Sequence, residues 1–245
     1  MFDLTLFIID FIVIWHITVA IQSIYVHRAI AHSYIKFNPV VEGLFRFWLW
    51  ATVAFNWPGW AKHYATHHRK HHRYSDLKND PHSPVHQTFK ELSDANTHML
   101  PESDHYISKE EYEKYAGNVA IHNDTLEHVF WKFPNLGLWI HMVIQTLLFG
   151  VTGFAVAVVY ALFHNMFITF VGKWVIHKIG FNYASTGKDQ SKIVFPIAVL
   201  LGGEELHTNH HNDASRRNFA VRWFEFDIGY WYCQLLVTFK LARWL

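Results

Sequence analysis

The sequence predicts an all-α integral membrane protein, built as a helical bundle in a single domain over residues 1–245. The first observation is composition, because 51% of the residues are hydrophobic, 18% are aromatic and only 17% are charged. A soluble surface usually needs more ionic groups. The second observation is two long apolar runs, near residues 4–26 and 136–176. The net charge of +1 argues against a nucleic-acid binder that relies on phosphate contacts.

The first apolar run, residues 4–26, is long enough for one bilayer crossing at about 1.5 Å per residue. Asp10, His16 and Gln22 interrupt it. Polar groups at membrane depth must face protein or a cavity, so we expect this helix to pack against others. The run lacks a basic leading stretch and a small-residue cleavage site, which favours a retained span over a signal peptide.

The next segment, residues 40–60, is apolar and rich in tryptophan, which favours the membrane–water boundary. We therefore expect an interfacial helix there rather than a full span. Residues 62–134 are more polar and are expected to form the first part of a soluble cap. Within them, Ser108 and Glu111 have the spacing of a capping box that opens a short helix.

The second long apolar run, residues 136–176, is interrupted near Gly150 and Gly153, which predicts a helical hairpin of two short or tilted spans. Residues 177–245 are expected to complete the cap, with their amphipathic end along the membrane interface. Lysine and arginine gather outside the apolar runs, and the turn near Gly150 carries none. The positive-inside rule then predicts a multi-pass protein with a cytoplasmic cap and an external N-terminus.

Histidine is the most unusual feature of the sequence, with 20 residues in all. The pattern His-x-x-His-His occurs twice, and a third pair, His27 and His32, follows the first apolar run. Offsets of three and four residues place side chains on one face of a helix. Neutral imidazole is a common ligand for iron, copper, zinc and nickel. The repeated pattern therefore predicts a metal centre within the cap.

The pair His27 and His32 is five residues apart, which is about 140° on an ideal α-helix. The two could serve one metal only if the end of the helix loosens, and otherwise they serve two neighbouring metals. We favour the second interpretation. Together with His177, the motifs give up to nine imidazoles, more than one metal ion takes, so we expect two.

The ligand type narrows the chemistry. Zinc offers no redox chemistry, calcium and magnesium prefer oxygen ligands, and copper is permitted. The single cysteine, Cys233, excludes a disulfide framework, cysteine-ligated zinc and iron–sulfur ligation within this chain. Two redox metals beside a lipid-facing cavity suggest oxygen activation against an unreactive C–H bond. A saturated acyl chain has no polar handle, so an apolar tunnel would place it by shape.

Three motifs carry a family resemblance: His27-Arg-Ala-Ile-Ala-His32, His68-Arg-Lys-His71-His72 with Asp80-Pro81-His82-Ser83-Pro84, and Gly202-Gly203-Glu204-Glu205-Leu206-His207-Thr-Asn-His210-His211. In this order they resemble the histidine boxes of membrane fatty-acid desaturases, closest to bacterial relatives of the stearoyl-CoA (delta-9) desaturases. The resemblance runs from about residue 15 to the C-terminus. It implies two iron ions that use O2 and two electrons to insert a cis double bond, in unsaturated fatty acid biosynthesis. The substrate would be a fatty acyl chain, as acyl-CoA or acyl-lipid.

The resemblance also assigns ligands by position. They are His27, His32, His68, His71, His72, His207, His210 and His211, with His177 as the additional histidine. Three departures stand beside this match. Lys173 occupies the place of an asparagine that holds an iron-bound water in the family. The relatives carry a further N-terminal membrane helix, and Asn212-Asp213 stands where an aromatic–proline step is usual.

Residues around the boxes have predicted roles of their own. Asp76 and Asp80 are candidates to orient histidines through hydrogen bonds. Four arginines are candidates for the phosphate-bearing head group of a substrate such as acyl-CoA, namely Arg69, Arg73, Arg216 and Arg217. The sequence has no haem or flavin motif, so the electrons must come from a separate donor protein of ferredoxin, rubredoxin or cytochrome b5 type.

Three alternatives remain open. A lipid or alkane hydroxylase of the same superfamily usually has His-x-x-x-His in its first box, whereas the spacing here is longer. A di-iron carboxylate bundle uses Glu-x-x-His, which occurs at Glu102–His105 and at Glu204–His207. A membrane metal transporter would need ligands within the membrane, whereas most histidines here lie at helix ends or outside.

Overall fold

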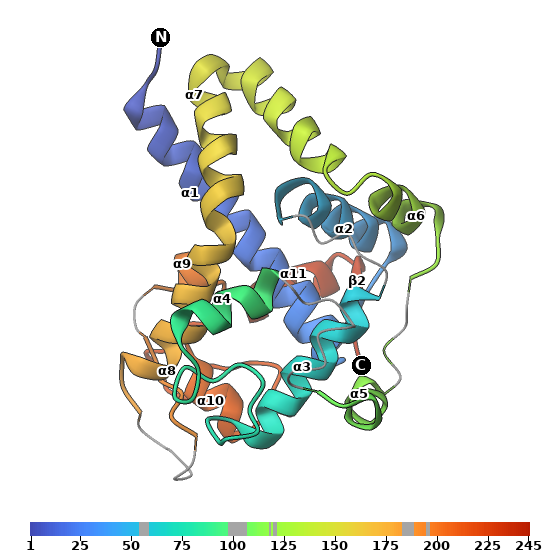
Figure 1. Cartoon of the computed structure of the whole chain (residues 1–245), viewed down its shortest axis with the longest axis vertical. Coiled ribbons are helices and arrows are strands. Elements are labelled where there is room, and N and C mark those ends of the chain that lie inside the picture. The colour runs from blue at the N-terminus through green and yellow to red at the C-terminus, as the bar shows by residue number, and fades with distance from the viewer. Residues whose placement is uncertain (54–58, 98–106, 118, 120–121, 183–188, 195–196) are drawn as a thin grey trace.

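The computed structural model describes residues 1–53, 59–97, 107–117, 119, 122–182, 189–194 and 197–245. The chain is mostly helical, as predicted. A tall pair of helical elements stands at one end, which we call the arm, and the shorter helices gather in a body at the other (Figure 1). Two helical stretches are long and apolar enough to cross a membrane, Leu4–Ala31 and Leu136–Lys178.

The first stretch begins with α1 (Leu4–Ile21), which Asp3 caps by accepting a hydrogen bond from the Leu6 amide. It continues without a break into η1 (Gln22–Ala31), a segment of π-helix. The helical stretch is therefore five residues longer than the predicted run of 4–26. This extension carries the chain from the apolar arm into the histidine-rich body (Figure 1).

The second stretch is α7 (Leu136–Thr169), followed by η2 (Phe170–Val175) and α8 (Ile176–Lys178). It is bent back on itself at Gly150, whose φ of +61° is non-helical (Figure 1). Glycine adopts positive φ without the steric cost that other residues meet. A Cβ on Gly153 would lie 2.0 Å from the Gln145 carbonyl oxygen, so the close approach of the two halves of α7 also requires glycine. The interruption that the two glycines predict is present.

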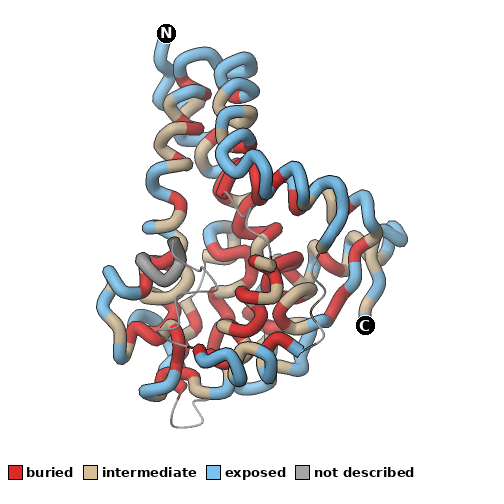
Figure 2. Tube along the Cα trace, turned by 45° about the vertical axis from the view of Figure 1, so that its right-hand side comes forward, coloured by how far each residue is buried: buried red, intermediate tan, exposed pale blue. Residues whose placement is uncertain are grey.

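The outer surface of this arm is apolar. Leu147, Leu148 and Leu162 are exposed by 80%, 65% and 70%. Figure 2 shows the exposed residues running along the arm, with the buried residues concentrated in the body. Contiguous exposed apolar surface of this kind needs a nonaqueous neighbour. The arm is therefore suited to a lipid environment.

The described part of the predicted interfacial helix at 40–60 is α2 (Pro39–Val53), and Trp60 belongs to α3 (Trp60–Tyr74). Residues 54–58 of the prediction lie outside the described residues. Gly59, with φ of +78°, stands at the N-terminal end of α3. This helix matters because it carries the second histidine box.

The remaining helices lie in the body. They are α4 (Phe89–Thr97), α5 (Lys109–Ala116), α6 (Thr125–Lys132), α9 (Ala198–Leu201), α10 (His207–Asn212) and α11 (Ile228–Thr238). The predicted capping box of Ser108 and Glu111 is present at the start of α5. The main core forms where α1 and η1 pack against α2, α3, α7 and α11.

The prediction of a purely α-helical fold is wrong in one detail. Strands β1 (Ile35–Phe37) and β2 (Ala242–Trp244) form an antiparallel pair, with Ile35 opposite Trp244 and Lys36 opposite Arg243. Ile35 and Phe37 are buried and Lys36 is exposed, which is the two-residue alternation of a strand. Three residues are too short a run for this alternation to stand out in the sequence.

Candidate metal centre

Eight histidines from the predicted boxes and His177 converge in the body, where their nine rings form two adjoining groups. Cluster one contains His27, His32, His68, His72 and His210, whose ligand atoms all lie within 4.8 Å of one another. Cluster two contains His71, His177 and His207, at the same spacing. The ninth ring, that of His211, lies 4.3 Å from His207 and 4.4 Å from His72 between ring centroids, where the clusters adjoin.

The α3 helix and α10 each supply both clusters. On α3, His68 and His72 point to cluster one and His71 to cluster two. Residues four apart share a helix face, while the residue between them is turned away by about 100° per position. On α10, His210 joins cluster one and His207 joins cluster two. The His-x-x-His-His spacing therefore serves to reach two sites from one helix.

The favoured interpretation of His27 and His32 is wrong, because both belong to cluster one. The reason is the π-helix η1, in which the backbone amide of His32 bonds to the carbonyl of His27 at 3.1 Å. An i→i+5 hydrogen bond winds five residues into about one turn and places the two rings on one side. The structure matches the other alternative, a loosened helix end.

The geometry of cluster one fits a metal ion. The Nε2 atom of His210 lies 3.0, 3.1 and 3.0 Å from those of His27, His32 and His72. Each neutral imidazole has one N–H, so a single nitrogen cannot satisfy three such contacts by hydrogen bonds alone. Nitrogens bound at about 2.1 Å and at right angles around one metal would lie about 3.0 Å apart. The cluster therefore has the spacing of a coordination shell.

Cluster two is held by buried aspartates. The Nδ1 of His71 lies 2.8 Å from Asp80, and the Nδ1 of His177 lies 2.9 Å from Asp76. A carboxylate on Nδ1 fixes the proton there and leaves the Nε2 lone pair free for a metal. His211 is oriented in the same way by Asp189, at 3.3 Å, and its buried Nε2 has no protein partner among the described residues. These donor sets suit a metal that prefers nitrogen.

Burial keeps most of the cluster imidazoles neutral. It lowers the pKa of His211 to about 4, although the hydrogen bond with Asp189 opposes this shift. Burial, reinforced by the other rings, likewise holds the pKa values of several more far below the usual range, namely His32, His68, His72, His207 and His210. Neutral imidazole is the form that binds metals. These six rings are therefore in the ligating form at neutral pH.

In cluster two, the contact between each histidine and its aspartate shifts the pKa in the direction opposite to burial. Burial would lower the pKa of His71, but the Asp80 carboxylate outweighs burial and raises it. Burial would raise the pKa of Asp76, but the hydrogen bond from His177 lowers it to about 2. Asp76 therefore remains an anion that can support its histidine throughout the physiological range.

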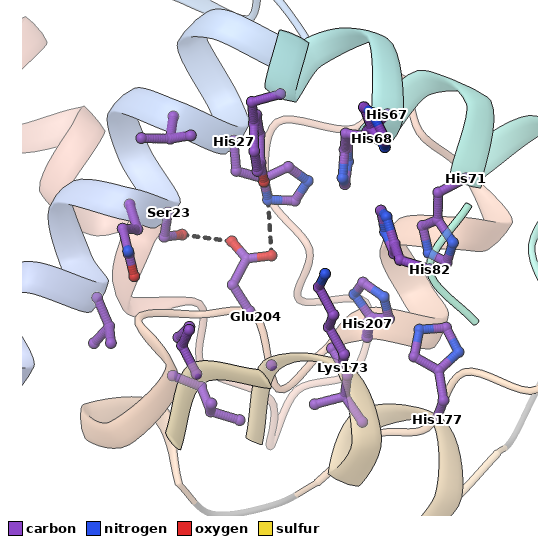
Figure 3. Close-up of a pocket in the computed structure, with 18 of the residues that line it drawn as sticks. Ser23, His27, His67, His68, His71, His82, Lys173, His177, Glu204 and His207 are labelled. Carbon is purple, nitrogen blue, oxygen red and sulfur yellow. Dashed lines mark hydrogen bonds and ion pairs between the residues drawn. The ribbon is translucent and has the colours of Figure 1, made fainter. Parts of the chain in front are cut away.

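Both clusters border one cavity of about 180 Å³ (Figure 3). Its apolar wall comes from α1, η1, α7 and η2, and includes Val19, Val26 and Ile168. Its polar side carries Glu204 and Lys173, and Figure 3 shows the Lys173 side chain reaching toward the labelled histidines. The cavity thus has an apolar wall on one side and the two histidine clusters on the other.

A buried charge network supports cluster one. Arg28 is fully buried, donates to both oxygens of Asp227 at 2.8 and 2.9 Å, and reaches Glu204 at 3.3 Å. Glu204 in turn lies 2.7 Å from the Nδ1 of His27 (Figure 3). The guanidinium also lies 4.0 Å above the ring of Phe219, which packs 4.2 Å from the ring of His210. One arginine therefore ties the first box to the third.

The four candidate head-group arginines are placed differently from one another. Arg69 donates to the backbone carbonyls of Ala31, Tyr115 and Ala116, so its guanidinium is engaged in joining α5 to η1. The other three are exposed, namely Arg73, Arg216 and Arg217. Arg217 donates to the Leu245 carbonyl and lies over the Trp244 ring, and Arg216 donates to the Asn218 carbonyl at 3.4 Å, so these three share exposure rather than freedom from contacts.

Sequence reasoning found Asp76 and Asp80 but missed Asp189, Arg28 and the contact of Glu204 with His27. Asp189 stands apart from every box, and nothing in the sequence connects it with His211. It also missed that His67 and His82 line the cavity beside the clusters (Figure 3). His82 lies within a quoted motif, and its ring stacks 4.3 Å from that of His71.

The Glu-x-x-His interpretation finds little support. Glu204 contacts His27 and Arg28 rather than joining a shared cluster with His207. The other pair, Glu102–His105, lies outside the described residues.

No family model matches the sequence. The chain is 25% identical over 173 residues to an acyl-CoA C20 Delta5-desaturase of Anemone leveillei, covering 69% of this chain and 52% of that protein. It is also 25% identical over 220 residues to an icosanoyl-CoA 5-desaturase of Limnanthes douglasii, covering 88% and 58%. A second acyl-CoA 5-desaturase of Anemone leveillei is 25% identical over 173 residues, covering 69% and 50%.

The chain spans about half the length of the curated relatives it matches. The similarity supports a relationship to the fatty acid desaturases, which agrees with the resemblance of the histidine boxes. The names of these relatives give the 5-position of the acyl chain, whereas the boxes suggested the delta-9 branch. The shared class is therefore supported, and the delta-9 branch is not.

Proposed function

We propose that this protein is a membrane-bound fatty acyl desaturase that uses two iron ions, O2 and two electrons to insert a cis double bond. The observation that carries the proposal is the pair of histidine clusters bordering one largely apolar cavity. The similarity to acyl-CoA 5-desaturases supports the choice of reaction. When bound, the iron pair would supply the oxidising power that an unactivated C–H bond requires.

The proposed ligands divide between the two sites. His27, His32, His68, His72 and His210 would hold one iron, and His71, His177, His207 and His211 the other. Glu204, Asp76, Asp80 and Asp189 would hold ligand rings in position through Nδ1. Such supporting carboxylates fix the tautomer and raise the basicity of the metal-bound nitrogen.

The cavity would position the acyl chain. A saturated chain offers no hydrogen bonds, so one C–C bond must be selected by how deep the chain lies between Val19, Val26 and Ile168. The reaction removes two hydrogens from neighbouring carbons. Together with two electrons and two protons from outside, these reduce one O2 to two waters. The contribution of the protein is to exclude bulk water and to align the two reacting carbons with the clusters.

The substrate carrier is proposed to be coenzyme A or a lipid, with Arg73, Arg216 and Arg217 as the exposed candidates for its head group. Delta-9 remains the position suggested by the boxes, and the 5-position is the competing outcome suggested by the relatives' names. We further propose that the long arm is embedded in a bilayer with both clusters on the cytoplasmic side. The two candidate spans support the embedding of the arm, and the cytoplasmic side rests on the positive-inside rule.

Lipid analysis of a host that expresses the protein tests this function directly. A new cis-monounsaturated acid should appear with the protein and disappear with His71→Ala, and its double-bond position would identify the branch. A hydroxylated product without an alkene would overturn the desaturase assignment in favour of a hydroxylase. Metal flux into vesicles without lipid turnover would instead indicate a transporter.

A further inference from the structure

The two-stranded pair of β1 and β2 carries an unusual arrangement of positive charge. Lys36 and Arg243 are exposed and stand directly opposite each other in the register. Like charges at directly opposed positions destabilise an antiparallel pair. Lys240, just before β2, is also exposed and lines a shallow groove with both of them. We call Lys36, Lys240 and Arg243 the basic ribbon.

The three basic side chains differ from other basic residues in their ion pairing. In the part of the chain that the structure describes, none of the three side chains forms an ion pair with a carboxylate. Basic residues elsewhere do so, since Arg46 binds Asp124 at 2.6 Å and Lys70 binds Glu111 at 2.8 Å. Lys240 also has a φ of +58°, which is uncommon for a residue other than glycine. Repulsion and strain at one exposed place favour a role outside folding.

The basic ribbon is joined directly to cluster one. Tyr34 precedes β1 and its ring stacks on that of His32, with centroids 5.0 Å apart and planes inclined by 22°. Tyr34 is buried, and its carbonyl accepts a hydrogen bond of 2.9 Å from the Leu245 amide, just past β2. Packed and covalently connected atoms therefore lead from the ribbon to a proposed iron ligand.

We propose that the basic ribbon docks an acidic one-electron carrier protein. The inference rests on the proposed function, because desaturation consumes two electrons that this chain has no motif to supply. Two reduced carriers would each give one electron to the metal pair and leave oxidised. These two electrons, the two hydrogens (two electrons and two protons) removed from the acyl chain and two protons from solution together reduce one O2 to two waters.

The physical features suit such a partner. Opposite charges steer short-lived encounters and raise association rates. Electron-transfer complexes use small interfaces, so a short ribbon is sufficient. An anionic membrane surface or a coenzyme A phosphate would be attracted by the same charges. The contact of Tyr34 with His32 favours the carrier, because a short packed path to cluster one serves electron transfer, whereas a phosphate head group or a membrane surface needs no such path.

The test uses the iron-loaded full chain, a reduced plant-type [2Fe–2S] ferredoxin as the probe, and the double variant Lys36→Glu/Arg243→Glu. We expect the apparent KM for ferredoxin to rise at least about tenfold, with a weaker dependence on salt. The matched control is Lys109→Glu/Lys114→Glu on α5, which makes the same change in charge at another exposed place and should leave this KM unchanged. Reduction by dithionite, which needs no docking surface, should be equal in all three proteins.

Two further measurements test whether coenzyme A or a membrane surface binds the basic ribbon instead. Neither the KM for acyl-CoA nor binding to phosphatidylglycerol vesicles should change in the ribbon variant. A ferredoxin KM equal to that of the control would overturn the proposal, and so would a loss confined to acyl-CoA or vesicle binding. Ferredoxin-driven reduction is measured without acyl substrate. A protein that makes no alkene but still shows the ribbon effect would reject the desaturase function and keep the docking surface.

Discussion

Cluster one draws five imidazoles from η1, α3 and α10, whereas cluster two draws three from α3, α8 and α10. In cluster one the Nε2 atoms crowd to about 3 Å, and the support comes from Glu204 and Arg28 behind His27. In cluster two, His71 and His177 each rest on a buried aspartate. The first site thus relies on many ligands, and the second relies on fewer ligands held more firmly.

This difference shows how one chain can build two sites from one ligand type. A site with five imidazoles should tolerate loss of one ligand better than the second site, which has the three of cluster two and, with His211, four proposed ligands. A site whose rings depend on aspartates should be more sensitive to those aspartates. The predictions below use matched changes in the two clusters.

The largest effect is expected for His71→Ala. Cluster two would lose one of its few ligands, so we expect bound iron to fall to about one per chain and desaturation to fall below detection. The matched change His72→Ala leaves four imidazoles in cluster one and should retain more iron. Metal analysis and lipid analysis on the same membranes check both. Normal desaturation by His71→Ala would remove cluster two from the active centre.

A large effect on folding is expected for Arg28→Met, because it strands Asp227 and Glu204 without their buried cation. Breaking a buried pair in this way costs about 3–5 kcal/mol. Lys62→Met is the control, because its partner Glu113 is 67% exposed and such pairs contribute about 1 kcal/mol or less. Thermal unfolding in detergent measures both. Equal losses in Tm would show that Arg28 has no special role.

The carboxylates allow a smaller and more selective comparison. Glu204→Gln should weaken the metal of cluster one, and Asp80→Asn that of cluster two, each by about 10- to 100-fold. We expect the larger factor for Asp80→Asn, because cluster two has fewer ligands to compensate. Competition with a chelator would resolve the two metals, with the exposed Asp213→Asn as control. Equal weakening of both metals by each variant would contradict separate sites.

The smallest effect concerns His63, which lies outside both clusters. Burial lowers its pKa to about 4. An unfolded histidine has a pKa near 6.5, so the unfolded state binds the extra proton as pH falls, and stability is lost below that value. Between pH 7 and pH 5 the loss would be about 2 kcal/mol. His63→Leu should reduce the fall in Tm of the metal-free protein over this range. An unchanged slope would show that His63 is not neutral when folded.

Much of this arrangement could be predicted from the sequence. The spacing of His68, His71 and His72 indicated a metal-binding helix, because a regular helix fixes the directions of its side chains. Gly150 indicated the bend in the long apolar run, because few other residues adopt its conformation.

Other features depend on packing that a local pattern does not contain. The π-helical turn between His27 and His32 changes which face the two rings share, and an ideal α-helix placed them apart. Asp189 reaches His211 only through the tertiary fold. The pairing of β1 with β2 joins segments about 200 residues apart, and each strand is too short to show a recognisable pattern in the sequence.

The central claim is that the nine histidines hold two iron ions at separate, adjoining places. Anomalous diffraction at the iron edge from crystals of the iron-loaded protein tests it most directly. We predict two peaks, one among His27, His32, His68, His72 and His210, and one among His71, His177, His207 and His211. A single peak, or peaks away from these rings, would contradict the account.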